Sequence, residues 1–467
     1  MTQSTDTRSG NARLEQLAHS PVGRLLWQYS LPAVAGMIVI SIYNVADRVF
    51  IGQWVGPEAI AGLSITLPVM NLSAALGVLI GGGAGARISL LLGAGDREGA
   101  FRTLGNALVL QIAIALAYIT TFYLFLDPIL CAFGASEVTL PYAREFLQYM
   151  LPGLMMINLA LSFNNCMRSS GYPMRAMVTN FIGAGLNVVL DPLFINVFGL
   201  GIKGAAIATS ISMAVSAVFV FAHFFNPRVT VYFRRGIYGL RWPIVAGILA
   251  IGAAPSLINA AASAVNAIIN NTLMRYGGDM AVAAAGLLTT LTTMGVMTMN
   301  GISQGMQPIV GFNYGAGHFD RMKRAFRLAV GAASVVAVSC SGFGLAFPEL
   351  WARAFTTSPE LIAGTSHACR MGLWAFWTVG FQVIATTLFM SIGKAGKSIF
   401  LSLSRQVIFL IPLMLLLSSR WQLDGLWLAF PLSDLLATLC TAAMVIWQWR
   451  QFKRVENGSE PFLPEKL

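Results

Sequence analysis

Charge is scarce in this chain. Only 10% of its 467 residues are charged and 56% are hydrophobic, whereas an ordinary soluble domain carries about 25% charged residues. Nineteen acidic and thirty basic side chains cannot cover the surface of a water-soluble protein of this size. The composition therefore excludes a soluble globule and predicts a chain whose main solvent is lipid.

Side chains that build active sites and metal centres are also few. The five cysteines are scattered without a CxxC pair, and the four histidines (His19, His223, His318, His367) are dispersed. An integral-membrane enzyme needs catalytic groups clustered at one membrane face, and a structural metal needs ligands at short spacing. We therefore expect no enzymatic activity, no cofactor and no structural metal.

Long polar segments are missing as well. The longest are residues 1–24 and 450–467, and neither is large enough for a soluble catalytic or nucleotide-binding domain. The first segment lacks the apolar stretch of a signal peptide, so no cleaved signal is expected. No basic cluster is interleaved with aromatic residues in a polar domain. We expect neither a nucleotide nor a nucleic acid as a partner.

What the chain does have is long apolar runs. A helix of about 20 residues crosses roughly 30 Å of hydrocarbon, and twelve runs of about this length or more recur along the sequence. We predict an all-α integral membrane protein with twelve transmembrane helices. The runs cover residues 31–55, 59–84, 103–126, 141–165, 174–197, 204–225, 243–274, 281–306, 326–349, 364–391, 398–418 and 424–448.

Lysine and arginine concentrate on alternate connections between these runs. If the N-terminus is cytoplasmic, 22 of the 30 basic residues fall on cytoplasmic segments and four fall on the opposite side. The remaining four (Arg48, Arg144, Arg370, Arg405) lie within or at the edge of the runs. Because cytoplasmic loops carry the excess of basic residues, we predict a plasma-membrane protein, in the bacterial inner membrane, with both termini in the cytoplasm.

The two halves of the chain repeat each other. "GAGD" from Gly93 corresponds to "GAGH" from Gly315, and "SSGYP" around Gly171 corresponds to "SIGKA" around Gly393 at the same separation along the chain. Six runs per half bring both halves in from the same side, so the pseudo-two-fold axis of the two six-helix bundles runs along the membrane normal. The predicted divisions are a cytoplasmic segment 1–24, a first lobe 25–226, a cytoplasmic linker 227–242, a second lobe 243–449 and a cytoplasmic tail 450–467.

Two acidic residues remain deep within the apolar runs of the first half. Asp47 has Tyr43 four residues before it, and Asp191 has Asn187 four residues before it, so each acid has a polar neighbour on its own helix face. An ionised group at mid-bilayer costs about 2.5–3.5 kcal/mol, so its presence indicates a function. Pro192 interrupts the helix ladder beside Asp191 and frees carbonyl groups. Two neighbouring desolvated carboxyls can alternate between holding a proton and holding a cation.

The equivalent positions of the second half carry no acid. When the first half is shifted onto the second by the offset of the repeat, Asp47 falls on Ile269 or Asn270, and Asp191 falls within the apolar stretch 411–413. The two halves therefore share a scaffold, while the titratable centre is predicted in the first half alone.

Three stretches of the first half carry a family resemblance. "SLPAVAGMIVISIYNVADRVFIG", "MRSSGYPMRAMVTNFIGAGLNVVLDPLFI" and "GIKGAAIATSIS" resemble the MATE (multidrug and toxic compound extrusion) transporters, particularly the MepA-like branch. The resemblance covers residues 21–449. It implies two six-helix lobes around a V-shaped cleft, and export of varied, often cationic organic compounds in exchange for H⁺ or Na⁺. It also implies an ion site formed by Asp47, Asn187, Asp191 and Thr209.

The substrate cleft is predicted from four uncharged side chains of the first half: Tyr43, Asn164, Met37 and Met213. The expected partners are small organic cations and the lipid bilayer, and we expect a monomer. The coupling ion stays open, although two carboxyls with few other oxygen ligands favour H⁺ over Na⁺. A further intramembrane acid, Asp434, lies outside the matched motifs, and the sequence leaves its role open between structure and function.

One alternative function shares this architecture. A flippase for lipid-linked oligosaccharides would also have two lobes of many helices, but its cavity must be strongly cationic to hold a pyrophosphate. The deep charges of this chain are mainly acidic, which favours cationic cargo. A channel is less compatible with the sequence, because channels usually repeat around a pore in four or five copies rather than two.

Overall fold

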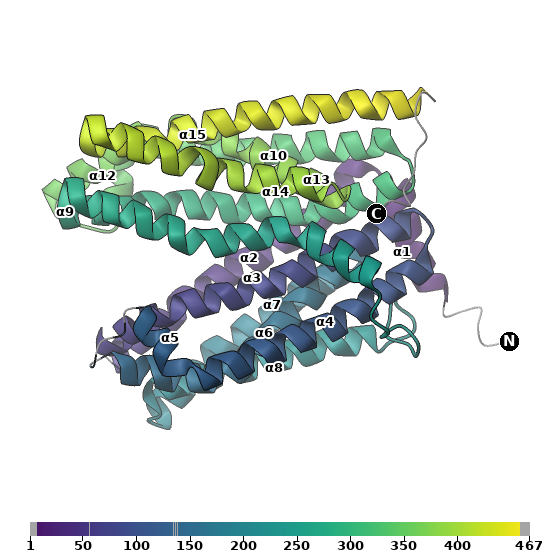
Figure 1. The fold of residues 1–467 in the computed structure, drawn as a ribbon, viewed down its shortest axis with the longest axis horizontal. Coiled ribbons are helices and arrows are strands. Elements are labelled where there is room, and N and C mark those ends of the chain that lie inside the picture. The colour runs from purple at the N-terminus through teal and green to yellow at the C-terminus, as the bar shows by residue number, and fades with distance from the viewer. Residues whose placement is uncertain (1–6, 56, 134, 136, 138, 458–467) are drawn as a thin grey trace.

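The computed structural model describes residues 7–457, apart from residues 56, 134, 136 and 138. Within this part of the chain every regular element is a helix. Figure 1 shows the helices gathered into two bundles that lie side by side and meet at one end. The described ends of the chain, at α1 and at the end of α15, lie at that same end of the molecule.

The first lobe contains six long helices. Their apolar composition explains why they form, since a helix satisfies all its backbone hydrogen bonds within one lipid-embedded segment. A separate short helix, α1 (Thr7–His19), precedes them, and α5 (Leu126–Ala132) caps the far end. The long helices are α2 (Val22–Trp54), α3 (Pro57–Gly93), α4 (Arg97–Leu124), α6 (Leu140–Ser169), α7 (Pro173–Pro192) and α8 (Gly201–Phe224), with a π-helical turn at Leu193–Val197 after α7.

The second lobe also crosses six times, although its elements are divided differently. α9 (Trp242–Gly315) turns back at Gly278 and α15 (Ile411–Glu456) turns back at Trp421 and Gln422, so α9 supplies two crossings and the later part of α15 one. α12 (Pro359–Gly372) and α13 (Val379–Ser391) form one span bent by 54°. α10 (Phe319–Ala346) is a further crossing, and α14 (Ala395–Leu403), a π-helical turn at Ser404–Leu410 and the first part of α15 together form the remaining one. The short elements are α11 (Pro348–Arg353) and a 3-10 turn at Phe376–Thr378. When α9 and α15 are divided at these turns, the described residues form six crossings in each lobe, and the prediction of twelve transmembrane helices in two six-helix bundles is confirmed.

The sequence repeat reappears as repeated turn geometry. Gly95 and Gly317 both adopt a positive φ (80° and 73°), as do Gly171 and Gly393 (103° and 73°). The first pair of turns is closed by the same backbone bond: Asp96 N donates to Leu91 O, and at the equivalent turn of the second half His318 N donates to Asn313 O. A left-handed residue after a helix is favourable only for glycine, so the two halves share the one residue type that these turns require.

The polar connections are packed against the lobes. Arg321 of α10 donates hydrogen bonds to the carbonyls of Leu17 and Ser20, at 3.2 and 2.7 Å, which attaches the end of α1 to the second lobe. The predicted linker, by contrast, is held by the first lobe, because Asn106 of α4 donates to the Ile237 carbonyl. The segment that leads into the first lobe is therefore attached to the second lobe, and the linker that leads into the second lobe is attached to the first.

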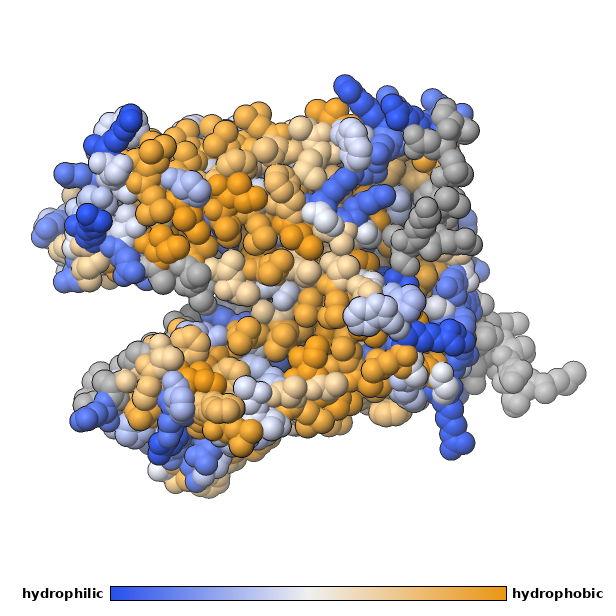
Figure 2. All heavy atoms as spheres, viewed as in Figure 1, coloured by the Kyte–Doolittle hydropathy of each residue, from blue (hydrophilic) through white to orange (hydrophobic). Residues whose placement is uncertain are grey.

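Glycine brings the two lobes into backbone contact at the end where the described termini lie, which we call the closed end. A Cβ on Gly83 of α3 would meet the carbonyl of Ile248 on α9, and a Cβ on Gly252 would meet the carbonyl of Leu79 on α3. Such contacts require residues without a side chain. At the opposite end the lobes separate, and Figure 2 shows a hollow between them. The cleft therefore opens away from the termini.

We predict that Gly252→Ala weakens the closed end. The new methyl group has no space beside the Leu79 carbonyl, and overpacking of this kind costs about 1–3 kcal/mol, a roughly 5- to 150-fold shift in an equilibrium. Spin labels at Met174 and Arg324, with the five native cysteines replaced by serine, would report the distance between the lobes at this end. Gly331→Ala is the matched control, because a Cβ there meets nothing within 4 Å. Identical distance distributions for both variants would contradict the prediction.

Candidate functional site

The acidic residue of α7 lies at the centre of a buried polar cluster. The side chains of Asn187 and Asp191 are both 0% exposed, and Thr209 of α8 is 9% exposed. The Asn187 amide nitrogen donates to Asp191 Oδ1 at 3.1 Å and to Thr209 Oγ1 at 3.0 Å. One amide group therefore links α7 to α8 and orients the carboxyl between them.

A second carboxyl belongs to the same cluster. Asp47 of α2 is partly buried, and its carboxyl interacts directly with that of Asp191. Tyr43, one helical turn before Asp47, lies within electrostatic range of both acids. The structure thus brings together the four predicted ion-site residues, Asp47, Asn187, Asp191 and Thr209, with Tyr43 beside them.

The cluster contains more hydrogen-bond acceptors than donors. Asp191 Oδ2 and Asn187 Oδ1 are buried and have no hydrogen-bond partner among the described residues. Leaving such atoms unsatisfied is costly away from water. A proton on a carboxyl or a small hard cation among these oxygens would satisfy them. This group of oxygen atoms is therefore suited to binding H⁺ or Na⁺.

The backbone beside Asp191 is irregular. Pro192 follows it directly and has no N–H to continue the ladder, and the chain then forms the π-helical turn Leu193–Val197. Turns of this kind occur mostly as single bulges, often at functional sites. The interruption predicted at Pro192 is present, and it gives α7 a local joint next to the acidic pair.

The predicted substrate-cleft residues lie in different surroundings. Met37 and Met213 are half-buried, and Met213 lies against Gly183 of α7. The backbone carbonyl of Met37 accepts a hydrogen bond from Ser41, whose hydroxyl also contacts the Met297 sulfur of the second lobe at 2.7 Å. α2 therefore touches both the acidic cluster and the opposite lobe.

Asn164 differs from the prediction that it lines the cleft. Its side chain is only 3% exposed, because its amide nitrogen donates to the Ala176 carbonyl at 2.7 Å and its oxygen accepts from Arg168 at 2.8 Å. Arg168 in turn contacts Gln304 of α9. In this conformation Asn164 belongs to the packing of α6 against α7 and positions an arginine that touches the second lobe.

The second lobe contains an ion pair that sequence reasoning did not find. Asp434, 3% exposed, accepts from Arg405 Nε at 2.6 Å, and its backbone carbonyl accepts from Gln382 at 2.6 Å. Two opposite charges in consecutive apolar runs were the available signal, since each needs a partner in lipid. The structure therefore gives Asp434 a structural partner. The side chain of Arg48, another charge within a run, lies outside the described part.

Comparison with known proteins shows which family this chain resembles. The MatE family profile matches residues 32–193 and again residues 255–416, so it covers corresponding parts of the two halves, in agreement with the sequence repeat. The FAD transporter of Shewanella oneidensis is 28% identical over 431 residues, spanning 90% of this chain and 93% of that protein. The multidrug export protein MepA of Staphylococcus aureus is 26% identical over 427 residues, spanning 91% and 94%.

Solved structures agree with this assignment. An outward-facing multidrug resistance MATE transporter of the MOP superfamily superposes with a TM-score of 0.88 at 25% identity, covering 95% of this chain and 98% of that chain. A MOP superfamily transporter from Pyrococcus furiosus, described as having a binding pocket of reverse polarity, superposes with a TM-score of 0.87 at 25% identity, covering 94% and 98%. The chain therefore belongs to the MatE family and is a multi-pass membrane transporter of the MATE type, with its helices in two six-helix lobes.

Proposed function

We propose that this transporter is an antiporter that exports organic cations in exchange for H⁺, with Asp47 and Asp191 as the coupling groups. The supporting observation is the carboxyl pair itself, in which Asp47 is partly buried and Asp191 is fully buried and oriented by Asn187. We further propose that the protein works as a monomer in the bacterial inner membrane, with both termini in the cytoplasm and the cleft of Figure 2 open to the outside.

The coupling follows from the charge of the pair. Two neighbouring carboxylates repel each other, and a bound proton removes that repulsion. α2 and α7, which carry the two acids, can then approach, with the π-helical turn after Asp191 accommodating the movement. Because α2 packs against α9 as well as against α7, a shift of α2 also changes the contact between the lobes.

The same charge selects the cargo. An organic cation in the cleft is attracted while the carboxyl pair is ionised and is released when a proton neutralises the pair, so the two ligands compete. This competition couples the two ligands, since each shifts the conformational equilibrium through its differential affinity for the two states. Na⁺ could replace H⁺ in this scheme, because the cluster offers only oxygen ligands.

Flavin nucleotides are a second candidate cargo, favoured by one observation. The Shewanella oneidensis relative is named a FAD transporter and aligns along 93% of its length. A dinucleotide with a diphosphate requires basic side chains in the cleft, whereas the buried cluster of the first lobe is acidic. The same electrostatic requirement weighs against a flippase for lipid-linked pyrophosphates.

Dye efflux under separate ion gradients tests the proposal. Cells or proteoliposomes containing the protein are loaded with ethidium, and efflux is followed with the proton gradient collapsed while the sodium gradient is maintained, and then with the reverse. We expect the efflux rate to fall at least fivefold in the first condition and to stay unchanged in the second. Loss only when sodium is removed would assign Na⁺ as the coupling ion. FAD release without ethidium efflux would replace the cationic cargo by flavin.

A further inference from the structure

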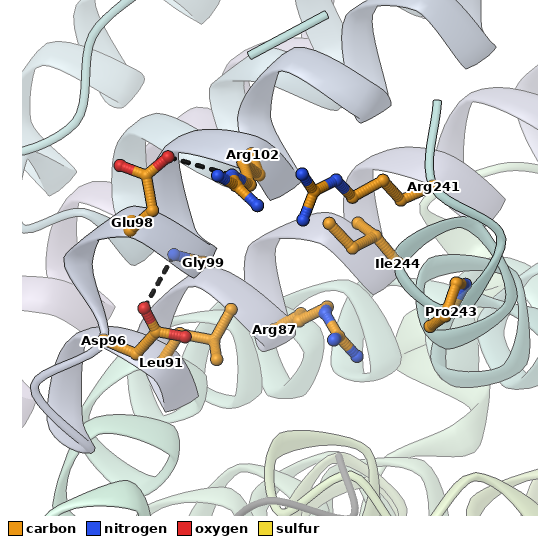
Figure 3. Close-up of a pocket in the computed structure, with 9 residues that line it drawn as sticks. All are labelled: Arg87, Leu91, Asp96, Glu98, Gly99, Arg102, Arg241, Pro243 and Ile244. Atoms are coloured by element: carbon orange, nitrogen blue, oxygen red, sulfur yellow. Dashed lines mark hydrogen bonds and ion pairs between the residues drawn. The ribbon is translucent and has the colours of Figure 1, made fainter. Parts of the chain in front are cut away.

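A pocket of about 580 Å³ lies at the closed end, away from the acidic cluster. Its walls come from the end of α3, the start of α4 and the start of α9, so it spans the boundary between the two lobes. Three arginines line it: Arg87 from α3, Arg102 from α4 and Arg241 immediately before α9. Figure 3 shows the guanidinium groups of Arg102 and Arg241 facing each other, while that of Arg87 lies apart from them, lower in the view.

Arg87 is the unusual member of this group. Only 8% of the residue is exposed, yet its Nε and Nη1 atoms have no hydrogen-bond partner among the described residues. Its guanidinium group lies directly against Gly247 of α9, where a Cβ would collide with Nη1. A buried cation without hydrogen-bond acceptors is costly. The pocket beside it is therefore the place where an anion would be stabilised.

The acids of the pocket are already engaged. Asp96 accepts from the Gly99 backbone N–H at 2.7 Å and caps α4, although its charge also attracts Arg87. Glu98 accepts from Arg102 Nε at 2.9 Å and from Arg234 of the linker. Arg241, which is exposed, makes no side-chain hydrogen bond or ion pair with the described residues. Arg241 is thus available to an incoming anion, and Arg87, whose charge is not neutralised by a direct partner among the described residues, lines the same pocket.

We propose that this pocket binds a phosphate group, held by Arg87 of α3 and by Arg241, the linker residue directly before α9. Planar guanidinium groups bind phosphate through paired N–H donors. Ile244 and Pro243 add an apolar wall, and the neighbouring Trp242 is 74% exposed, as expected for a side chain at the membrane interface. Both features suit the headgroup of an anionic phospholipid, although free phosphate shares the same chemistry.

Binding at this place has a consequence for the conformation. Arg87 lies on α3, whereas Arg241 is the linker residue directly before α9, and its backbone N–H donates to Asn106 of α4 at 2.9 Å. A phosphate group that bridges them ties the start of α9 to α3 at the place where Arg87 packs against Gly247, and so stabilises the conformation with the closed end shut. The bound lipid would therefore favour the state in which the cleft opens away from the termini.

Thermal unfolding of the purified full-length protein tests the proposal. In a neutral detergent we expect phosphatidylglycerol to raise the unfolding midpoint at least twice as much as phosphatidylcholine does. Arg87→Gln and Arg241→Gln should each lose at least half of this difference. Arg324→Gln is the matched control, because it removes an exposed arginine from α10, outside the pocket, and should keep the full difference. The exposed position of Arg241 makes that variant informative even if the buried Arg87 variant does not fold.

The same thermal unfolding measurement with inorganic phosphate shows whether the bound phosphate belongs to a lipid headgroup or is free phosphate. If millimolar phosphate reproduces the stabilisation and loses it in Arg241→Gln, the pocket binds free phosphate. If only phosphatidylglycerol acts, the ligand is the lipid headgroup. Equal stabilisation of Arg241→Gln and Arg324→Gln by either ligand would overturn the site, because binding would then depend on overall charge alone. No stabilisation by either ligand would overturn it as well.

Discussion

Asp191→Asn is expected to abolish export while the protein remains folded and inserted. Asparagine keeps the size of the side chain and can still accept from Asn187, but it can neither bind a proton reversibly nor carry a charge. The carboxyl pair with Asp47 is thereby reduced to a single acid, and the competition between proton and organic cation is lost. We expect efflux of a cationic dye to fall at least tenfold at matched expression, measured together with resistance to a toxic cation. Asp47→Asn should have the same effect.

The control for this experiment is Asp424→Asn. Asp424 also accepts a hydrogen bond, from His367 at 2.6 Å, but both side chains are more than half exposed and lie outside the carboxyl pair. This variant should export at the wild-type rate. Equal elution of all variants in size-exclusion chromatography would show that folding is intact. Wild-type resistance in both Asp47→Asn and Asp191→Asn would refute the proposed coupling.

Asp434→Leu is expected to destabilise the second lobe strongly. It leaves the Arg405 guanidinium, 26% exposed, without the carboxylate that binds it at 2.6 Å. Removing one partner of a buried ion pair costs about 3–5 kcal/mol, because the other charge is left uncompensated. Chemical or thermal unfolding of the protein in detergent would measure the loss.

The double variant Asp434→Leu with Arg405→Met tests whether Asp434 serves only to pair with Arg405 or also takes part in transport. Replacement of a buried pair by apolar residues of similar volume is often close to neutral, so the double variant should recover most of the stability. If Asp434 is structural, the double variant also exports dye at a near-normal rate per folded molecule. A stable double variant that does not export would instead assign Asp434 to the transport cycle.

Much of this protein is determined by the order of residues along the chain. The apolar runs fix the number of helices, because each run has to satisfy its own backbone hydrogen bonds in lipid. The repeat between the two halves predicts the paired turns at Gly95 and Gly317, since only glycine adopts their backbone conformation freely. Spacing of four residues on one helix is enough to place Tyr43 beside Asp47 and Asn187 beside Asp191.

Contacts between helices are decided only by the tertiary structure. The sequence does not state that Arg405 binds Asp434, that Gly252 meets the Leu79 carbonyl, or that Arg87 and Arg241 share one pocket. The sequence also led to the prediction that Asn164 lines the cleft, although the packing of α6 against α7 buries this side chain. The physical reason is that helical periodicity is a local property, whereas the angle and depth at which two helices pack depend on side chains far apart in the chain.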